Sequence, residues 1–418
     1  MIKNIKGTKD ILPNETDLWQ YVELKIHHFF KKYGYKEIRT PSFEDSALFH
    51  RSIGEETDIV SKEMYSWIDQ GGKSLTLKPE VTASVVRAFN QHNLGHENKI
   101  NKLYYIDSLF RRERPQKGRY RQFQQFGIET MGSDRPEQDA EIIAMAHNLY
   151  KFLKIDGIVI KLNSIGSSDS RIKYKKALGD YLKKYENDLS DLSKKRLQTN
   201  PLRILDTKIN SEIDIIKQAP KITDYLDSED KQHYDKVKEY LNELEIKFIE
   251  DPLLVRGLDY YSRTVFEIHS DSLGSQNALC GGGRYDCLIE ELGGKSTPAI
   301  GFAAGIERLI LALDKEKHDY MQNPYIYFVA LGEKAIKCSL KIIDDLRMKN
   351  DLAVVTDSLN RNLKAQMKEA NKLNVSYSII LGENELKDNK LIIKNMSTGN
   401  QEEIAIDELS FFFKNNIK

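Results

Sequence analysis

The chain has 418 residues, and its 63 basic and 63 acidic residues give a formal net charge of +0. This length exceeds one ordinary hydrophobic core and predicts two or three domains. A content of 40% hydrophobic and 30% charged residues excludes a disordered or fibrous chain. The balanced charge excludes a globally basic nucleic-acid binder, so such a partner must be bound by a local patch.

The three cysteines, Cys280, Cys287 and Cys338, are odd in number and include no CxxC pair. This count argues against a disulfide framework and against a zinc ribbon. The amino-terminal residues lack the apolar run of a signal peptide, and no later stretch approaches the roughly 20 apolar residues of a membrane span. We therefore expect a soluble protein of the reducing cytoplasm with no membrane partner.

The first predicted elements are a helix and a short strand. Apolar residues recur every three or four positions from Leu18 to Tyr33 and stop at Gly34, which predicts an amphipathic helix ended by glycine. Residues 35–41 follow as a strand that ends at Pro41. The helix is expected to pack on a sheet.

Two longer strands are predicted over residues 102–111 and 122–131, joined as an antiparallel hairpin with a long loop. Residues 111–122 carry five Arg and one Lys against one Glu, a net charge of +5. Guanidinium groups stay charged and bind phosphate through paired hydrogen bonds, so this segment suits a triphosphate or a nucleic-acid backbone. A solvated charged loop is the alternative.

Alternation along the second strand of this hairpin places Phe123, Gln125, Gly127 and Glu129 on one face. A ring, an amide, a bare backbone position and a carboxylate in a row offer a stacking surface and polar contacts to a ligand. For a strand considered alone, simple exposure of a polar face is the alternative.

The middle of the chain changes composition. After a predicted strand over residues 158–163, residues 166–250 consist of short helical stretches rich in Lys, Asp and Glu, with 17 basic and 17 acidic residues. We expect a helical insertion there, without a charge signature for nucleic acid. Strand and helix signals with dense glycine return over 253–313, where the first domain is expected to resume. From residue 324 on, alternating strands and helices predict a small α/β domain.

Two further segments combine arginine with tyrosine or glycine. Residues 255–267 include Arg256 beside Tyr260 and Tyr261, and phenols next to arginine can bind a small polar ligand. Tyrosines packed in a core are the alternative. Residues 281–286, Gly-Gly-Gly-Arg-Tyr-Asp, lack the spacing of a dinucleotide fold or a P-loop. They indicate a close backbone approach or a turn.

Together these segments resemble the histidyl-tRNA synthetases, a family of class II aminoacyl-tRNA synthetases, over nearly the whole chain. Pro41 resembles the proline of class II motif 1, residues 110–129 resemble motif 2, and residues 301–311 resemble motif 3. Residues 254–267 and 278–286 resemble the two histidine-specific motifs of that family.

The resemblance implies an α+β class II catalytic domain, with an antiparallel sheet flanked by helices, over residues 1–165 and 251–320. It implies a helical insertion domain over 166–250 and a C-terminal α/β anticodon-binding domain over 324–418. It also implies a homodimer with motif 1 at the interface. The implied substrates are ATP, L-histidine and tRNA(His), with Mg²⁺ bound to the ATP by protein ligands that the sequence does not assign.

The implied reaction joins histidine to ATP as histidyl-adenylate, releases pyrophosphate, and then transfers histidine to the 3′-terminal adenosine of tRNA(His). Arg111 matches the motif 2 arginine at the α-phosphate, Arg308 matches the motif 3 arginine at the γ-phosphate, and Arg256 matches an additional catalytic arginine. Phe123 is expected to stack on the adenine. Two further residues are expected to bind ATP: Glu113 and Arg119.

For the amino acid, Glu80, Thr82 and Gln125 resemble the group that holds the α-amino end. Glu129 and Tyr261 resemble the pair that reads the imidazole, because a carboxylate and a phenol can pair with its two nitrogens. Two further tyrosines are expected to bind histidine: Tyr260 and Tyr285. Two residues lie where the motif 2 loop of this family approaches the tRNA acceptor end: Arg114 and Gln116.

Two alternatives belong to the same superfamily. The regulatory subunit of ATP phosphoribosyltransferase senses histidine without aminoacylation, generally lacks the anticodon domain and has degraded catalytic motifs. This chain instead keeps Arg111, Arg256 and Arg308. A class II synthetase for another amino acid, such as proline or threonine, is disfavoured by residues 256–261.

Overall fold

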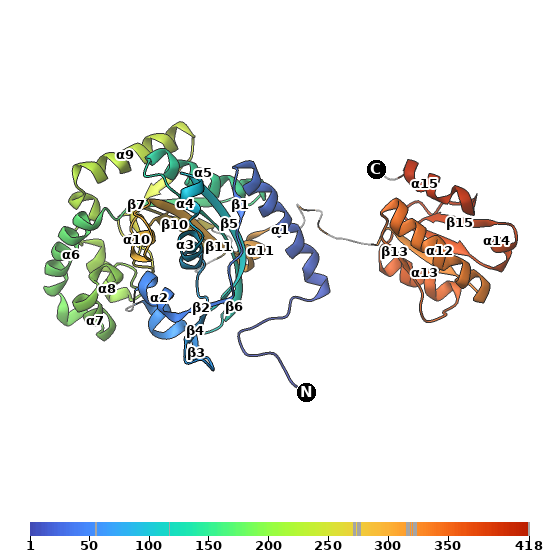
Figure 1. Ribbon diagram of the computed structural model, residues 1–418, viewed down its shortest axis with the longest axis horizontal. Coiled ribbons are helices and arrows are strands. Elements are labelled where there is room, and N and C mark those ends of the chain that lie inside the picture. Colours follow the sequence, from blue (N-terminus) through green and yellow to red (C-terminus); the bar gives the residue numbers. More distant parts are fainter. Residues whose placement is uncertain are drawn as a thin grey trace. The chain divides into compact units, whose positions relative to one another are not determined.

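The computed structural model describes residues 1–54, 57–116, 118–270, 273, 277–314, 318, 320 and 324–416. The chain divides into two compact units, Met1–Asp319 and Tyr320–Lys418 (Figure 1). Lys117, part of the arginine-rich segment, lies outside the described residues. In the described part of the chain, none of the helices combines the length and the apolar character that a bilayer crossing requires.

An eight-stranded sheet forms the framework of the first unit, in the order β1-β5-β6-β11-β10-β9-β7-β8. Its strands are β1 (Lys36–Glu37), β5 (Asn101–Phe110), β6 (Gln122–Met131), β7 (Ile158–Ser164), β8 (Phe248–Glu250), β9 (Ser262–Ser270), β10 (Ala278–Arg284) and β11 (Ala299–Gly305). The six central strands pair antiparallel, and the edge strands β1 and β8 join in parallel. The predicted antiparallel sheet is confirmed.

The first helix packs on this sheet, as its spacing predicts. α1 (Pro13–Lys32) begins with Pro13, which lacks the N–H that a first-turn residue would leave without a partner. The ring of Phe30, which is fully buried, contacts rings on three neighbouring strands: Tyr104, Phe126 and Phe302. The strand that follows is shorter than the predicted residues 35–41, since only Lys36–Glu37 pairs with β5.

The remaining elements of the N-terminal part include a small sheet that the sequence analysis does not predict. Its strands are β2 (Phe43–Asp45), β3 (Tyr65–Ile68) and β4 (Ser74–Leu77), in the order β2-β4-β3. The other helices of the first unit, outside residues 165–247, are α2 (Ser46–Ile53), α3 (Thr82–Gln91), α4 (Leu94–Glu97), α5 (Pro136–Phe152), α10 (Leu288–Glu291) and α11 (Ile306–Ala312), with a π-helical turn over Ile59–Glu63.

The predicted hairpin is the central pair of the large sheet. β5 and β6 pair over ten residues, from Asn101 opposite Met131 to Phe110 opposite Gln122. β11 pairs with the other edge of β6 and places Gly301 opposite Glu129. The hairpin and the motif 3 strand therefore meet at the residues that carry the predicted chemistry.

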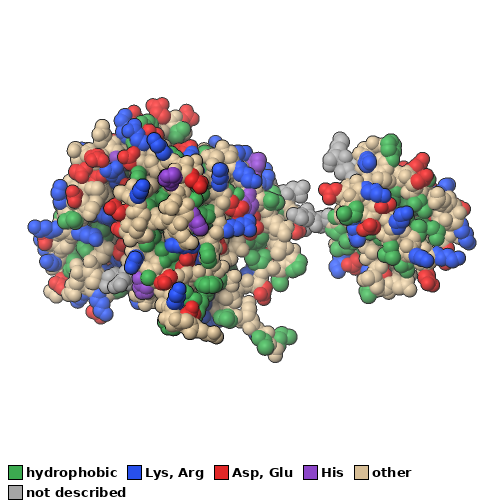
Figure 2. All heavy atoms as spheres, in the orientation of Figure 1, with side chains coloured by type: hydrophobic (Ala, Val, Ile, Leu, Met, Phe, Trp, Pro, Cys, Tyr) green, Lys and Arg blue, Asp and Glu red, His purple; other side chains and the backbone are tan. Residues whose placement is uncertain are grey.

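Residues 165–247, between β7 and β8, are called the inserted segment below. They form α6 (Ser168–Lys183), α7 (Asp191–Thr199), α8 (Asn210–Lys217) and α9 (Ser228–Glu243), joined by short 3-10 turns. This helical content agrees with the composition. On the face of each unit that Figure 2 shows, basic and acidic side chains are interspersed.

The second unit is built on a five-stranded sheet in the order β13-β12-β14-β15-β16. Its elements are β12 (Ile326–Ala330), α12 (Glu333–Asn350), β13 (Val354–Thr356), α13 (Leu363–Lys372), β14 (Tyr377–Leu381), α14 (Glu383–Lys387), β15 (Lys390–Asn395), β16 (Gln401–Ala405) and α15 (Leu409–Asn416). β12 pairs in parallel with β13 and β14, whereas β15 and β16 join antiparallel. The predicted α/β architecture is confirmed.

Candidate active site

A cavity of about 430 Å³ opens over the centre of the large sheet. Its walls include every residue predicted to bind ATP or histidine: Glu80, Thr82, Arg111, Glu113, Arg119, Phe123, Gln125, Glu129, Arg256, Tyr260, Tyr261, Tyr285 and Arg308. These residues come from segments more than 200 positions apart in the chain. The fold therefore joins residues of class II motifs 2 and 3 and of both histidine-specific segments into one site.

The two residues expected at the tRNA acceptor end lie elsewhere. Arg114 and Gln116 line a separate cavity of about 500 Å³, together with Lys62 and Glu63. Arg112, in the same loop, donates its backbone N–H to the carbonyl of Glu63 at 2.7 Å. The contribution of the π-helical turn to this loop is a feature that the sequence does not indicate.

One end of the main cavity is cationic. Glu113 lies between two arginines, with its carboxylate 3.7 Å from Arg111 Nη1 and 3.3 Å from Arg119 Nη1. Arg308 donates to the carbonyl of Ala278 at 3.0 Å. Burial, followed by the positive charge of Arg119, lowers the pKa of Arg308. Three arginine charges lie at this end of the cavity beside the single carboxylate of Glu113, so this end favours an anionic ligand.

The second histidine-specific segment explains how Arg256 fits beside the sheet. Arg256 donates to Glu267 on β9, whose other oxygen is 2.8 Å from His269 Nε2. Burial opposes ionisation of Glu267, yet Arg256 and His269 together lower its pKa to about 2. A Cβ atom at Gly281 on β10 would collide with the guanidinium of Arg256. The close approach predicted from the triple glycine is therefore an approach to the proposed catalytic arginine.

The other end of the cavity is a buried polar pocket around Glu129, which is 1% exposed. Its carboxylate accepts hydrogen bonds from Thr82 Oγ1 at 2.7 Å and from the hydroxyl of Tyr285. A Cβ atom at Gly301 would collide with this carboxylate. The phenol that contacts Glu129 is thus Tyr285, whereas the family resemblance pairs Glu129 with Tyr261 in reading a bound imidazole.

Glu80 occupies the amino end of α3. Its two carboxylate oxygens accept hydrogen bonds from the backbone N–H groups of Thr82 and Ala83, each at 2.8 Å, an arrangement that the helix dipole stabilises. The rings of Tyr260 and Tyr261 lie side by side, with centroids 4.8 Å apart. Both rings line the same cavity as Glu129.

Tyr105 is a cavity residue that sequence reasoning missed. It looks like a core residue of β5, and it is 1% exposed. Its hydroxyl lies close to Thr82 and Glu129, so Tyr105 lines the same buried pocket. The signal that could have found it is its register, because Tyr105 lies opposite Gly127 and a Cβ atom there would collide with its hydroxyl.

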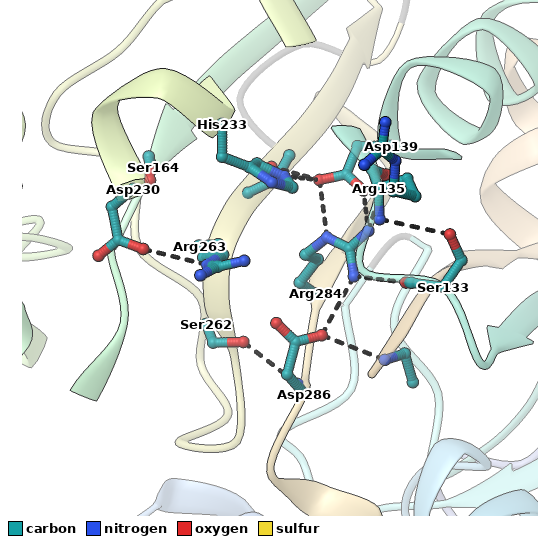
Figure 3. A network of polar contacts seen from close by, with 12 residues as sticks. Ser133, Arg135, Asp139, Ser164, Asp230, His233, Ser262, Arg263, Arg284 and Asp286 are labelled. Carbon is teal, nitrogen blue, oxygen red and sulfur yellow. Dashed lines mark hydrogen bonds and ion pairs between the residues drawn. The ribbon is translucent and has the colours of Figure 1, made fainter. Parts of the chain in front are cut away.

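Arg284, which precedes Tyr285, is held by a buried network rather than by the cavity. Arg284 and Asp139 of α5 are both fully buried and lie 2.6 Å apart, from Nη2 to Oδ1 (Figure 3). Asp139 also accepts from Thr264 Oγ1 at 2.6 Å and lies 2.8 Å from His233 Nε2 of α9. Arg284 therefore fixes the backbone next to Tyr285, and the hydroxyl of Tyr285 contacts Glu129 from this position.

The charge state of Glu129 gives a prediction for stability. Burial raises the pKa of Glu129 from 4.5 to about 8, so between these pH values the folded chain holds a proton that the unfolded chain has released. The free energy of unfolding of the ligand-free protein is expected to fall, through this group, as pH rises across the range. Urea denaturation measured at several pH values should show that Glu129→Gln loses this part of the dependence. Identical pH dependence in both proteins would contradict the assignment.

Comparisons with protein families and known proteins support the resemblance seen in the motifs. A family model described as histidyl-tRNA synthetase matches residues 7–309, and one described as anticodon binding domain matches residues 326–416. The chain is 45% identical to the histidine-tRNA ligase of Staphylococcus saprophyticus, covering 99% of this chain and 100% of that protein. It is 47% identical to the histidine-tRNA ligase of Macrococcus caseolyticus, covering 99% of each.

Among solved structures, the crystal structure of apo S. aureus histidyl-tRNA synthetase is similar with a TM-score of 0.85 and 40% sequence identity, covering 99% of this chain and 100% of that one. Sequence, fold and the convergence of the motifs in one cavity agree. The chain belongs to the histidyl-tRNA synthetase family.

Proposed function

We propose that this chain activates L-histidine with ATP and then transfers the histidine to the 3′-terminal adenosine of tRNA(His). The observation that carries the proposal is the polarity of the main cavity. Arg256 lies beside Tyr261 in this cavity. One end gathers Arg111, Arg119 and Arg308, and the other end holds the buried Glu129 beside Tyr285. A triphosphate suits the first end and an imidazole suits the second.

In the first step, a carboxylate oxygen of histidine attacks the α-phosphorus of ATP. The bond from that phosphorus to the β-phosphate bridging oxygen breaks, and pyrophosphate leaves. Arg111 and Arg256 hold the α-phosphate and Arg308 holds the γ-phosphate. Such transfers depend on positioning and on fixed cations that meet developing negative charge, so no side-chain nucleophile is required.

In the second step, a ribose hydroxyl of the terminal adenosine attacks the carbonyl carbon of the adenylate, and AMP leaves. Arg114 and Gln116 approach the acceptor end in this proposal. Their cavity is next to the main one, because Glu113 and Arg119 line both.

Substrate recognition follows the same division of the cavity. Phe123 stacks on the adenine. The guanidinium carbon of Arg111 lies 5.3 Å from the centroid of the Phe123 ring. Glu80, Thr82 and Gln125 hold the α-amino end of histidine. Glu129 and Tyr261 read the imidazole, while Tyr260 and Tyr285 enclose it. A buried polar pocket of this kind rejects analogues that leave its groups without partners.

Mg²⁺ accompanies the ATP in this proposal. Among the described residues, no group of three or more His, Cys, Asp or Glu side chains could hold a metal ion. Mg²⁺ commonly keeps several waters and binds through substrate phosphates plus one or two carboxylates, and Glu113 at the cationic end fits that pattern. The metal would neutralise charge on the triphosphate.

We also propose a division of labour along the chain. Residues 1–165 and 251–320 form the catalytic domain, 166–250 form a helical insertion that reaches the tRNA acceptor arm, and 324–418 read the anticodon.

A cytoplasmic homodimer is part of the proposal. The exposed rings of Phe43 and Trp67, which follow motif 1, support an interface there, and a monomer in sedimentation equilibrium would contradict it.

The transfer step is tested by charging. Purified protein, ATP, Mg²⁺ and labelled histidine are incubated with a tRNA(His) transcript and with a second tRNA as control. We expect label in tRNA(His) alone. The regulatory alternative is less supported, because full-length relatives are histidine-tRNA ligases. Histidine binding without any charging would favour that alternative.

A further inference from the structure

The segment that carries Arg256, Tyr260 and Tyr261 has no regular structure of its own. Residues 255–261 form neither helix nor strand, and β9 begins only at Ser262. A connection of this kind is positioned by side-chain contacts rather than by a ladder of backbone hydrogen bonds. Several of the contacts that hold it come from the inserted segment.

The first contact is made by α6. Arg171 donates through Nη1 to the backbone carbonyl of Tyr261 at 2.6 Å and to that of Asp259 at 3.4 Å. One guanidinium therefore binds the carbonyls on both sides of Tyr260. Because a charged donor makes a strong hydrogen bond, this contact sets the path of the backbone that carries both tyrosines.

The second contact is made by the turn after α7. Arg203 Nη2 donates to the carboxylate of Asp259 at 3.0 Å, and Asn200 Nδ2 donates to the same oxygen at 3.2 Å. The backbone N–H of Asp259 donates in turn to the carbonyl of Ile53 at 3.2 Å. Asp259 is thus fixed from its side chain by the inserted segment and from its backbone by the rest of the first unit.

The third contact is made by α9 on the far side of the tyrosines. Arg263 has a φ of +47°, which a residue other than glycine rarely adopts. Its side chain donates to Asp230 at 3.0 Å (Figure 3). The side chain also donates to Glu229 at 2.6 Å, and the backbone N–H donates to the carbonyl of Gly166 at 2.9 Å. Strain of this kind persists where the surroundings hold it.

We propose that the inserted segment positions the histidine-reading tyrosines, and that Arg171 is the principal positioning residue. This inference rests on the proposed function, since it concerns the same amino-acid pocket. Histidine affinity is then coupled to the helices of the inserted segment. A ligand that binds and moves α6 changes the affinity for histidine by some factor, and by linkage bound histidine changes the affinity for that ligand by the same factor.

The test is histidine-dependent ATP–pyrophosphate exchange by Arg171→Ala in the full chain. Loss of a charged hydrogen bond is expected to raise the KM for histidine roughly 10-fold or more, with the KM for ATP changed less than about two-fold. Arg171→Lys keeps one charged donor and should recover part of the loss. Lys173→Ala, an exposed position on the same helix, is the matched control and should behave as wild type.

Arg203→Gln removes a different contact to the same connection and should give the same histidine-selective change. It decides the question if Arg171→Ala does not fold. An unchanged KM for histidine, or equal rises for histidine and ATP, would overturn the inference. A wild-type protein that shows no exchange with histidine would instead overturn the proposed function.

Discussion

Replacing Arg256 with alanine is expected to lower the rate of histidine-dependent pyrophosphate exchange by about 10²–10³-fold. Arg256 lies in the main cavity, paired with Glu267 and beside Gly281, where a Cβ atom would exclude its guanidinium. In the proposed reaction it stabilises charge at the α-phosphate as pyrophosphate leaves. The KM for histidine should change far less than the turnover rate, because the interaction strengthens in the transition state.

The variant leaves Glu267 without its main counter-charge, so folding must be checked by thermal unfolding. Arg256→Lys keeps the positive charge without the planar fork and is expected to recover only part of the rate. Arg135→Ala removes an exposed arginine outside the cavity and serves as the control. Near-normal exchange by folded Arg256→Ala would require the catalytic role to be abandoned.

Replacing Glu129 with glutamine is the second large effect. The change keeps the size of the side chain but removes the carboxylate that we assign to the imidazole. Losing the hydrogen bond of this carboxyl group in a buried pocket should weaken histidine binding by about 10²-fold. ATP binds at the other end of the cavity, so its affinity should change little.

Separate titrations of histidine and ATP by calorimetry measure the two affinities. Glu137→Gln, an exposed carboxylate on α5, is the control. Equal losses for both ligands would mean that the substitution disrupts the cavity as a whole, and the reading of the imidazole by Glu129 would be wrong.

Much of this site could be predicted because its functional residues occur in local sequence patterns. Strand alternation placed Phe123, Gln125 and Glu129 on one face, and all three line the cavity. The triple glycine indicated a close approach, which the structure shows at Gly281. The antiparallel hairpin followed from two apolar runs around a charged loop. Each of these depends on residues near one another in the chain.

The remaining features depend on contacts between distant segments, which no local pattern contains. No role was predicted for Arg284, whose partner Asp139 lies 145 positions earlier. The contact of Arg171 with Tyr261 spans 90 positions. Tyr105 was not predicted as a site residue, since it lies among apolar residues of a predicted strand. Such pairs are set by how α5, α6 and the sheet pack, and the sequence reveals them only once the fold is known.

The most direct measurement is ATP–pyrophosphate exchange by the purified protein with Mg²⁺ and each standard amino acid in turn, without tRNA. Exchange with histidine alone is the predicted result, because the cationic end of the cavity binds ATP and the Glu129 pocket accepts histidine as its partner substrate. Exchange with another amino acid, or none with histidine in folded protein that binds it, would contradict the account.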